Sequence, residues 1–440
     1  MRQTWASIMG DSRAASVERT TWIWALVVFV VGFFQIPAFI EALWPRQDVL
    51  SDFYQDWASA RNYLTGLPIY ADHRETIPRY VGQVDPLSFS NRVNAHPPSS
   101  VLPLILLARL DYRTALLVWN LASLALLGLS LYVVARGVGL LLSVWKVCAG
   151  SALLLLCRPL LQQLFHGQWN LLLLALLTGS WAAGRSGRPA WAGTLVGVAA
   201  AIKLFPAFLF LYFGLRRQWV ALFAGALTLV LLSGFTMMIL GAESYRYYVQ
   251  DVVPRLHKFR TSWFNASLLG FWTKLFDPAT REERVEPLYR SAAAARVAIL
   301  ASWLGVLAVL TASVRRAQTR VQFDHAFGVA TTGMLLLSPI TWDYAFLLLL
   351  VPATLLWVDP PRSEAGKLLL ILALAGLWFW QKPLCSLMIP GGVSQGVAQP
   401  LHTVTVISYP CYSLVVLLLL GASRAVDDRR DPPTPGILSS

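Results

Sequence analysis

The chain has 440 residues, of which 56% are hydrophobic and only 13% are charged. Soluble domains carry about 25% charged residues, so this composition excludes an ordinary water-soluble protein and indicates a polytopic membrane protein. The formal net charge of +13 does not predict a nucleic-acid partner, because excess Lys and Arg gather in the cytoplasmic loops of membrane proteins.

The N-terminal part joins a basic segment, residues 1–20, to the first long apolar run, residues 21–44. This run is too long for the apolar region of a signal peptide, and no small-residue cleavage site follows it. We therefore expect it to remain as the first span, with the basic segment in the cytoplasm. The predicted domains are the cytoplasmic segment 1–20, a membrane domain 21–422, and a disordered cytoplasmic tail 423–440.

Residues 45–96 form the longest polar stretch between two apolar runs, and the first span would deliver them to the outer face. The stretch holds six carboxylates, at Asp48, Asp52, Asp56, Asp72, Glu75 and Asp85. A large acidic outer loop of this kind is a candidate place for chemistry at one face of the membrane.

Nine further apolar runs come close to the length of about 17–25 residues that a membrane helix needs. They are 114–135, 147–165, 169–184, 218–240, 291–314, 324–340, 342–358, 367–383 and 403–421. Three segments are too short or too broken to cross alone and are predicted to be re-entrant: 97–110, 190–215 broken at Pro206, and 262–276. The predicted fold is an all-α bundle of about 10–12 transmembrane helices whose short loops satisfy the positive-inside rule.

This topology brings the unusual polar residues to the outer side, where we expect one shared site. Polar groups near the bilayer are costly, so they usually line a cavity or serve a function. Asp52 and Asp56 lie one helical turn apart and could share a face. A carboxylate there could act as a general base, the two together could hold a divalent metal, or Asp52 could be an ordinary loop carboxylate. No cysteine pair with metal or redox spacing is present, and no cofactor is predicted.

Two cations, Arg158 and Lys203, stand in strongly apolar surroundings. A buried charge needs an anionic partner, and a phosphate group would supply one. Pairing with a protein carboxylate or snorkelling to the interface are the alternatives. A basic cluster in the predicted outer loop runs against the usual charge bias and indicates an anionic ligand; its members are Arg255, His257, Lys258 and Arg260.

Several other polar or aromatic residues are candidates for binding substrate. Gln168 and Asn170 suit sugar hydroxyls, although they could equally bond neighbouring helices. His96 opens the first re-entrant segment, where a structural cap is the simpler interpretation. The remaining candidates are Asn265, Trp342 and Asp343.

At this point a set of motifs resembles family 87 of the glycosyltransferases. The first is the outer-loop pattern Asp52-Phe53-(x)4-Ala58-(x)5-Leu64-Thr65-Gly66-Leu67-Pro68-Ile69-Tyr70. The others are His96-Pro97-Pro98, Arg158-Pro159, Gly167-Gln168-Trp169-Asn170, Ala201-Ile202-Lys203-Leu204-Phe205-Pro206, Asn265-Ala266-Ser267-Leu268 and Ser338-Pro339-Ile340-Thr341-Trp342. The resemblance covers roughly residues 20–420, and it rests on the order of the motifs along a polytopic chain.

The resemblance implies the GT-C fold, a polyprenyl-phosphate-linked sugar donor, and a catalytic base in the first outer loop, which Asp52 matches. Members of the family include mycobacterial mannosyltransferases that use polyprenol-phosphate-mannose. This chain departs from the family in one place. Members often carry histidine after the Ser-Pro-x-x-Trp motif, whereas this chain has Asp343 and Tyr344, so phosphate neutralisation would shift to Arg158, Lys203 or the basic cluster.

The sequence therefore predicts an inverting hexosyltransferase of the plasma or inner membrane, with mannose as the expected sugar. The donor would be a polyprenyl-phosphate sugar, the acceptor a lipid or glycan, and the site would lie at the outer face. The absence of a GxxxxGK[ST] loop agrees with a donor that carries no nucleotide. The alternatives are a secondary transporter, because broken helices also mark transport sites, or a GT-C enzyme with another donor and acceptor, such as a glycan ligase.

Overall fold

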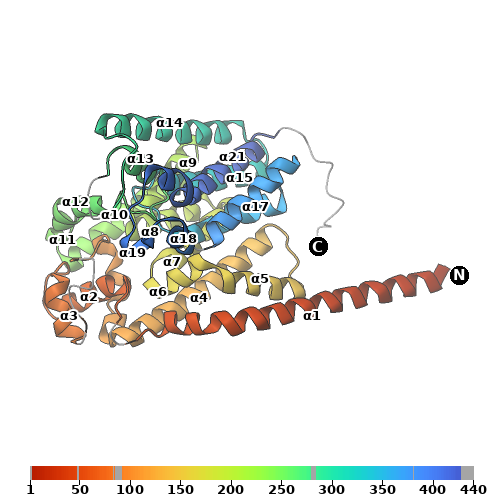
Figure 1. The fold of residues 1–440 in the computed structure, drawn as a ribbon, viewed down its shortest axis with the longest axis horizontal. Coiled ribbons are helices and arrows are strands. Elements are labelled where there is room, and N and C mark those ends of the chain that lie inside the picture. Colours follow the sequence, from red (N-terminus) through yellow and green to blue (C-terminus); the bar gives the residue numbers. More distant parts are fainter. Residues whose placement is uncertain are drawn as a thin grey trace.

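The computed structural model describes residues 2–46, 49–82, 84, 92–278, 284–379 and 381–427, without side chains for 2–17 and 394. These residues fold into a bundle of helices with no β-strand among them (Figure 1). The predicted all-α polytopic fold is confirmed. Asp48, Asp85 and the part of the predicted tail from 428 to 440 lie outside the described residues.

Four helices of the described chain are long and apolar enough to cross a membrane by themselves. They are the 18–43 portion of α1 (Arg2–Leu43), α4 (Tyr112–Gly137), α10 (Trp219–Leu240) and α14 (Ala292–Arg316). Counting three bent helix pairs as single spans raises the number to seven, which is below the expected 10–12. The difference arises because several predicted spans are interrupted or short rather than straight.

The interruptions follow proline and polar residues in the sequence. The run 147–165 forms α5 (Val144–Leu156) and α6 (Arg158–His166), which meet at an angle of 59°. Pro159 sits in the first turn of α6, where it is tolerated, and it cannot donate the hydrogen bond that would continue α5. The predicted run 147–165 is therefore a candidate span that is broken in its middle, a bend that the apolar pattern did not indicate.

The three predicted re-entrant segments are indeed short or broken. Residues 97–110 form three single 3₁₀ turns, η2 (Pro98–Ser100), η3 (Leu102–Leu104) and η4 (Leu107–Arg109). The segment 190–215 breaks between α8 (Pro189–Ile202) and η5 (Phe205–Phe208), which leads into α9 (Leu209–Leu215). The segment 262–276 contributes only α13 (Leu268–Phe276).

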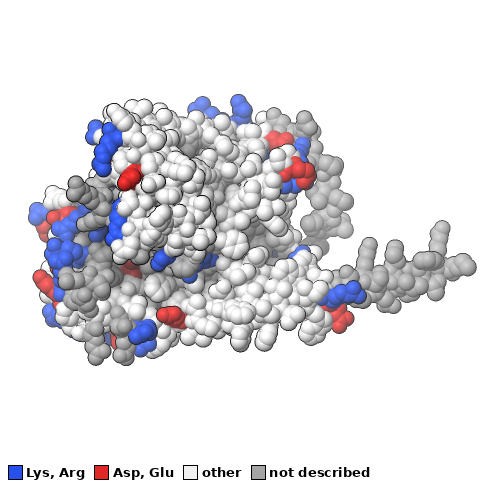
Figure 2. Space-filling view, in the orientation of Figure 1, with Lys and Arg blue, Asp and Glu red and all other residues white. Residues whose placement is uncertain are grey.

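The described surface separates charge from apolar side chains. In Figure 2 the charged residues gather mostly at the two ends of the long axis, with a largely uncharged band between them. Large apolar side chains on α1, such as Phe29, Phe33 and Phe34, are exposed, although it packs against α5 and α6. An apolar band bounded by charged ends is the surface that a bilayer requires.

The α7 helix (Asn170–Arg185) defines the two ends of the bundle used below. Its 16 residues span about 24 Å at 1.5 Å per residue. Gln168 and Trp169 precede it at what we name the Asp52 end, and Arg185 closes it at the Arg185 end. The predicted outer loop is packed onto the Asp52 end as α2 (Phe53–Leu64) and α3 (His73–Tyr80), at the left of Figure 1.

Close packing of α8 against α10 fixes the position of the α8 terminus. A Cβ atom at Gly193 would overlap the carbonyl oxygen of Ala221, and one at Gly197 would overlap that of Gly225. Small residues four apart allow two helix backbones to touch, as they do in many membrane helix pairs. The end of α8, and Lys203 directly after it, is therefore carried by a pair of helices in backbone contact.

Candidate active site

Asp52 stands immediately before α2 but does not cap it. An aspartate at this position usually accepts a hydrogen bond from the first turn of its own helix, whereas the Asp52 side chain makes no such bond. Its Oδ2 instead accepts a hydrogen bond of 2.8 Å from Nε2 of Gln168. The side chain is 27% exposed, and among the described residues no hydrogen bond reaches Oδ1. Asp52 therefore has one oxygen held in place and one left for another molecule.

Gln168 links Asp52 to a cation. Its Oε1 accepts a hydrogen bond of 2.8 Å from Nζ of Lys203, so the amide is used on both sides. Lys203 follows the last residue of α8, where the helix breaks. No carboxylate lies within 4 Å of Lys203 in the described part of the chain, so its ammonium group is held by a neutral amide. Gln168 thus bridges a carboxylate and an ammonium group that interact electrostatically but form no direct ion pair.

The turn that carries Gln168 requires glycine at position 167. Gly167 ends α6 with φ at +59°, and a Cβ atom there would lie 2.6 Å from Cβ of Phe53. Its carbonyl oxygen accepts a hydrogen bond of 2.9 Å from Nε1 of Trp119. This turn places His166 before the glycine and Gln168 and Trp169 after it, all three toward α2.

Asp56 is the centre of a closed network rather than a second accessible carboxylate. Its side chain is 3% exposed. The carboxylate oxygens meet Nδ1 of His96 at 2.9 Å and Nε1 of Trp169 at 3.0 Å. Asn94 and Ser100 donate further hydrogen bonds of 3.1 and 3.2 Å. The contact between Asp56 and His96 was not predicted from the sequence, and neither group can bind an acceptor or a metal ion without breaking these bonds.

The electrostatics of Asp56 agree with this structural role. Burial by itself raises the pKa of a carboxyl group, but the charge and hydrogen bond of His96 and the bonds from Trp169 and Asn94 outweigh burial. The pKa of Asp56 is therefore held below its usual value. Asp56 is ionised at neutral pH and fastens α2 to the loop before η2 and to the start of α7.

His166 completes the surroundings of Asp52, and the sequence analysis did not select it. Its Nδ1 lies 3.5 Å from Oδ2 of Asp52, beyond a normal hydrogen bond, and its side chain is 30% exposed. The ring is 5.8 Å from that of Tyr344, and His166 acts electrostatically on Asp343. The sequence feature that could have identified His166 is its position directly before the Gly-Gln-Trp-Asn motif.

Arg158 and Asp343 share one part of the site. Arg158 begins α6, and Asp343 begins η9 (Asp343–Leu349), which packs against α6. Asp343 is the charged group that acts on Arg158. Both predicted phosphate-binding cations thus lie within electrostatic reach of protein carboxylates: Asp343 acts on Arg158, and Asp52 and Asp56 act on Lys203.

Three predicted substrate-binding residues are occupied by contacts within the protein. Asn265 donates to the carbonyl oxygens of Arg260 and Pro339, at 3.1 and 3.0 Å, and accepts from the amides of Ser267 and Thr341. Asn170 donates to Gln163 and joins α7 to α6. Trp342 packs edge-on against Phe259. These contacts favour structural roles for the three residues.

A second charged network lies at the Arg185 end and is closed. Asp359 accepts hydrogen bonds from His325 at 2.9 Å and from Arg424, whose guanidinium also reaches Asp427 at 2.8 Å. His325 belongs to α15 (Arg320–Leu337) and Arg424 to α21 (Tyr409–Ala425). Asp359 follows α16 (Leu350–Val358), so the network ties three helices together.

Fold and site together define a class of protein: an α-helical membrane protein with a partly exposed carboxylate and a lysine, joined through one amide, at one end of the bundle. The chain belongs to glycosyltransferase family 87, whose family model matches residues 94–339, more than half of the chain. The matched region contains Gln168 and Lys203. Asp52 lies before the matched region in the sequence and contacts it through the hydrogen bond from Gln168.

Two curated relatives carry the printed name polyprenol-phosphate-mannose-dependent alpha-(1-2)-phosphatidylinositol pentamannoside mannosyltransferase. The relative from Mycolicibacterium smegmatis is 27% identical over 278 residues, which cover 61% of this chain and 62% of the relative. The relative from Mycobacterium tuberculosis is 31% identical over 220 residues, covering 49% of this chain and 46% of the relative. The matches thus span about half to three fifths of those proteins. No solved structure gives a significant match.

Proposed function

We propose that this protein is an inverting glycosyltransferase that moves a hexose, with mannose expected, from a polyprenyl-phosphate donor to a lipid or glycan acceptor. Family membership and the names of the relatives support the donor class. The observation that carries the mechanism is the arrangement of Asp52, Gln168 and Lys203. It offers a base and a cation that is not tied up in a direct ion pair among the described residues, which are the two groups that this reaction needs.

In the proposed reaction Asp52 takes the proton from an acceptor hydroxyl group. The hydroxyl oxygen forms a bond to the anomeric carbon of the donor sugar, and the bond between that carbon and the phosphate oxygen breaks. Polyprenyl phosphate leaves with its negative charge, so no acid is needed to protonate it. Oδ1 of Asp52 is the oxygen available for the proton, while Gln168 holds Oδ2.

Lys203 is the residue that we assign to the leaving phosphate. Its ammonium group has three donors, and only the one to Gln168 is used among the described contacts. Arg158 is the other candidate, but among the described contacts no hydrogen bond connects it to Asp52, whereas Gln168 joins Lys203 to that base. A cation placed before the reaction stabilises charge that develops on the phosphate oxygen.

His166 supplies an imidazole where the chain lacks the histidine that often follows the Ser-Pro-x-x-Trp motif. It comes from α6 instead, next to Tyr344 and within electrostatic reach of Asp343. We propose that His166 contacts the donor phosphate or acceptor at this position. Its partial exposure and its incompletely bonded Nδ1 support this role.

Family membership favours the transferase over a secondary transporter, and the mechanism predicts a covalent product that a transporter would not make. The test is to incubate purified protein with polyprenyl-phosphate sugars and lipid extract, and to analyse the products by mass spectrometry. We expect a lipid or glycan heavier by one hexose with polyprenyl-phosphate-mannose. Movement of sugar across proteoliposomes without any such product would refute the proposal.

The outer-face location of the site and the plasma or inner membrane location are part of the proposal. They are supported by the basic loops, which the positive-inside rule assigns to the cytoplasm. In a cysteine-free background, Arg74→Cys on exposed α3 should react with an impermeant thiol reagent applied to intact cells, and Arg316→Cys should not. The reverse labelling pattern would place the site at the cytoplasmic face.

A further inference from the structure

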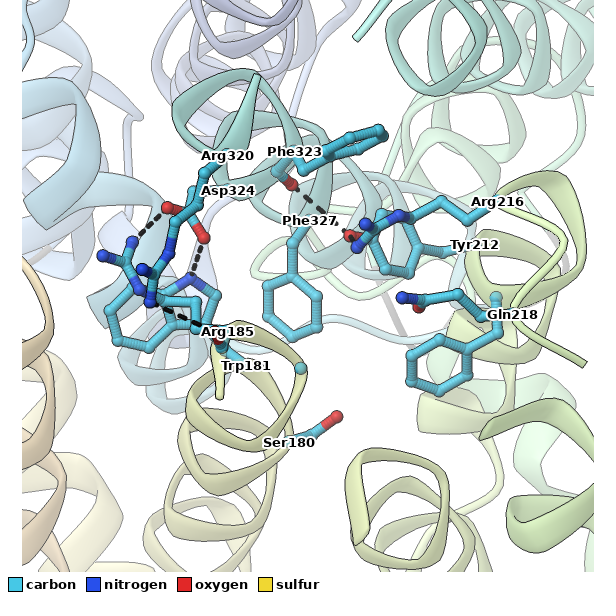
Figure 3. A pocket seen from close by; sticks show the side chains of 12 residues that line it. Ser180, Trp181, Arg185, Tyr212, Arg216, Gln218, Arg320, Phe323, Asp324 and Phe327 are labelled. Carbon is cyan, nitrogen blue, oxygen red and sulfur yellow. Dashed lines mark hydrogen bonds and ion pairs between the residues drawn. The ribbon is translucent and has the colours of Figure 1, made fainter. Parts of the chain in front are cut away.

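A cavity lies at the Arg185 end, about the length of α7 away from Asp52. It has a volume of about 250 Å³ and lies between the ends of α7 and α9 and the starts of α10 and α15 (Figure 3). Pockets for drug-sized ligands have about 300–1,000 Å³, so this one suits a small group rather than a whole lipid-linked sugar.

The lining of the cavity carries more positive than negative charge. Three arginines line it, Arg185, Arg216 and Arg320, against one carboxylate, Asp324. Asp324 is already used, because it forms an ion pair with Arg185 and accepts a hydrogen bond of 2.9 Å from Nε1 of Trp181. The other two arginines form no ion pair among the described residues, although Asp324 and Arg185 lie within electrostatic reach of Arg320.

The hydrogen bonds of these two arginines go to neutral groups and orient both side chains. Arg216 donates a hydrogen bond of 2.9 Å to the Tyr212 hydroxyl, and its guanidinium lies 3.9 Å from the centre of the Phe323 ring. Arg320 donates to the carbonyl oxygen of Arg185 at 3.1 Å. No carboxylate lies within ion-pair distance of either in the described ranges. Figure 3 shows Arg216 and Arg320 on opposite sides of the cavity, with Phe327 between them.

Exposed aromatic side chains mark the depth of this cavity in the membrane. Trp219 begins α10 directly after Gln218, which lines the cavity, and Trp191 lies in the first turn of α8; both are exposed. Exposed tryptophans at helix ends are typical of the boundary between lipid tails and water, where lipid phosphate groups lie. Val220 and Phe223 extend an apolar, exposed surface along α10 away from the cavity mouth.

We propose that this cavity binds the phosphate group of an anionic lipid, with Arg216 and Arg320 as its ligands and the acyl chains lying along α10. Planar guanidinium groups are suited to phosphate oxygens, and basic pockets between membrane helices are known to hold lipid head groups. This site is separate from the one that carries the proposed transfer reaction, and it does not depend on that proposal.

The test uses the purified full-length protein, stripped of lipid in detergent. Binding of dioctanoyl phosphatidylglycerol is followed by thermal unfolding and native mass spectrometry, with dioctanoyl phosphatidylcholine and inorganic phosphate in parallel. The variants are Arg216→Gln with Arg320→Gln, and Arg320→Gln alone in case the double variant fails to fold. Arg217→Gln is the matched control, because it removes the same charge from an exposed neighbour that does not line the cavity. The variant Lys203→Met shows whether the lipid binds at the Asp52 end, because lipid bound there would be lost in this variant.

We expect phosphatidylglycerol to raise the unfolding temperature of the wild type, and its affinity to fall about tenfold in the cavity variants while Arg217→Gln and Lys203→Met retain it. If inorganic phosphate stabilises the protein equally, and the cavity variants lose this effect, the cavity is an anion-binding site whose ligand is free phosphate rather than a lipid. The proposal is overturned if neither probe binds, if phosphatidylcholine binds as well, or if Arg217→Gln loses as much affinity as the cavity variants.

Discussion

Asp52, at one end of the bundle, and the carboxylates at the other end differ in the groups to which they are bonded. At the Arg185 end, Asp359 is enclosed by Arg424 and His325, and Asp324 by Arg185 and Trp181. At the Asp52 end, Asp52 is held by the neutral amide of Gln168 and keeps one oxygen unbonded among the described residues. A carboxylate paired with arginine is inert and stabilises the fold, whereas one held by an amide keeps the capacity to take a proton.

Asp56 shows that proximity to the site does not decide the role of a carboxylate. It lies one helical turn from Asp52 on the same helix, yet its oxygens are bonded to His96, Trp169 and two further donors. The comparison therefore separates carboxylates that hold helices together from the one that can perform chemistry. Four substitutions test this separation, beginning with the largest expected effect.

Asp52→Asn is expected to reduce sugar transfer by about 10²–10⁴-fold, because the amide keeps the shape of the side chain but cannot take a proton. Transfer is measured with polyprenyl-phosphate-mannose under conditions that saturate the wild type. The unfolding temperature and the donor affinity should stay close to those of the wild type. Activity within tenfold of the wild type would make Asp52 an ordinary loop carboxylate.

Arg424→Met is expected to lower the free energy of unfolding by about 3–5 kcal/mol, because it leaves the charge of Asp359 without its guanidinium partner. Turnover per folded molecule should be unchanged. Arg362→Met is the matched control: Arg362 is more exposed and lies 3.4 Å from Asp427 at the edge of the network, so its loss should cost at most about 1 kcal/mol. Equal losses in the two variants would mean that the network is not a stabilising unit.

Asp56→Asn is expected to cost about 2–3 kcal/mol of stability, because the amide cannot accept all the hydrogen bonds that the carboxylate accepts. Its turnover should fall less than that of Asp52→Asn. Because the pKa of Asp56 is lowered in the folded protein, its contribution is present above the ordinary aspartate pKa of about 3.9 and is lost as pH falls through the lowered value. Acid titration of stability should therefore be steeper in the wild type than in the variant.

Lys203→Met is expected to weaken donor binding about tenfold with a smaller change in stability, because the lysine is bonded to a neutral amide and its removal breaks no direct ion pair among the described residues. Lys203→Arg, which keeps the charge, should retain more affinity. A marked loss of stability with unchanged donor affinity would identify Lys203 as a structural residue instead.

The sequence predicted most of the fold because apolar runs and prolines act locally. The spans at α4, α10 and α14 match the predicted runs within about three residues at each end. The break before Pro206 was also predicted, since proline removes a helix hydrogen bond wherever the chain goes. The bend between α5 and α6 was missed although Pro159 signalled it, because the apolar run continues through the bend.

The site was predicted only in part, because its division of roles depends on contacts between distant segments. Nothing local distinguishes Asp52 from Asp56; the difference comes from His96 and Trp169, which are 40 and 113 positions away from Asp56. Asn265 carries a strong family motif, yet the structure shows its amide fully bonded to nearby backbone. His166 was overlooked because an imidazole beside a motif has no spacing rule that marks it.

The backbone contact between α8 and α10 also bears on how fast the proposed reaction can run. Gly197 lies six residues before Lys203, about 9 Å along the helix, and it keeps the two backbones in touch. A charge carried on so stiff a support does not have to move when negative charge appears on the leaving phosphate. In water, solvent molecules must reorient around the developing charge during the reaction. A fixed ammonium group is already in position, so the free-energy cost of that reorientation is avoided. If Lys203 stabilises the leaving phosphate as proposed, two glycines that touch no substrate contribute to the lower activation barrier.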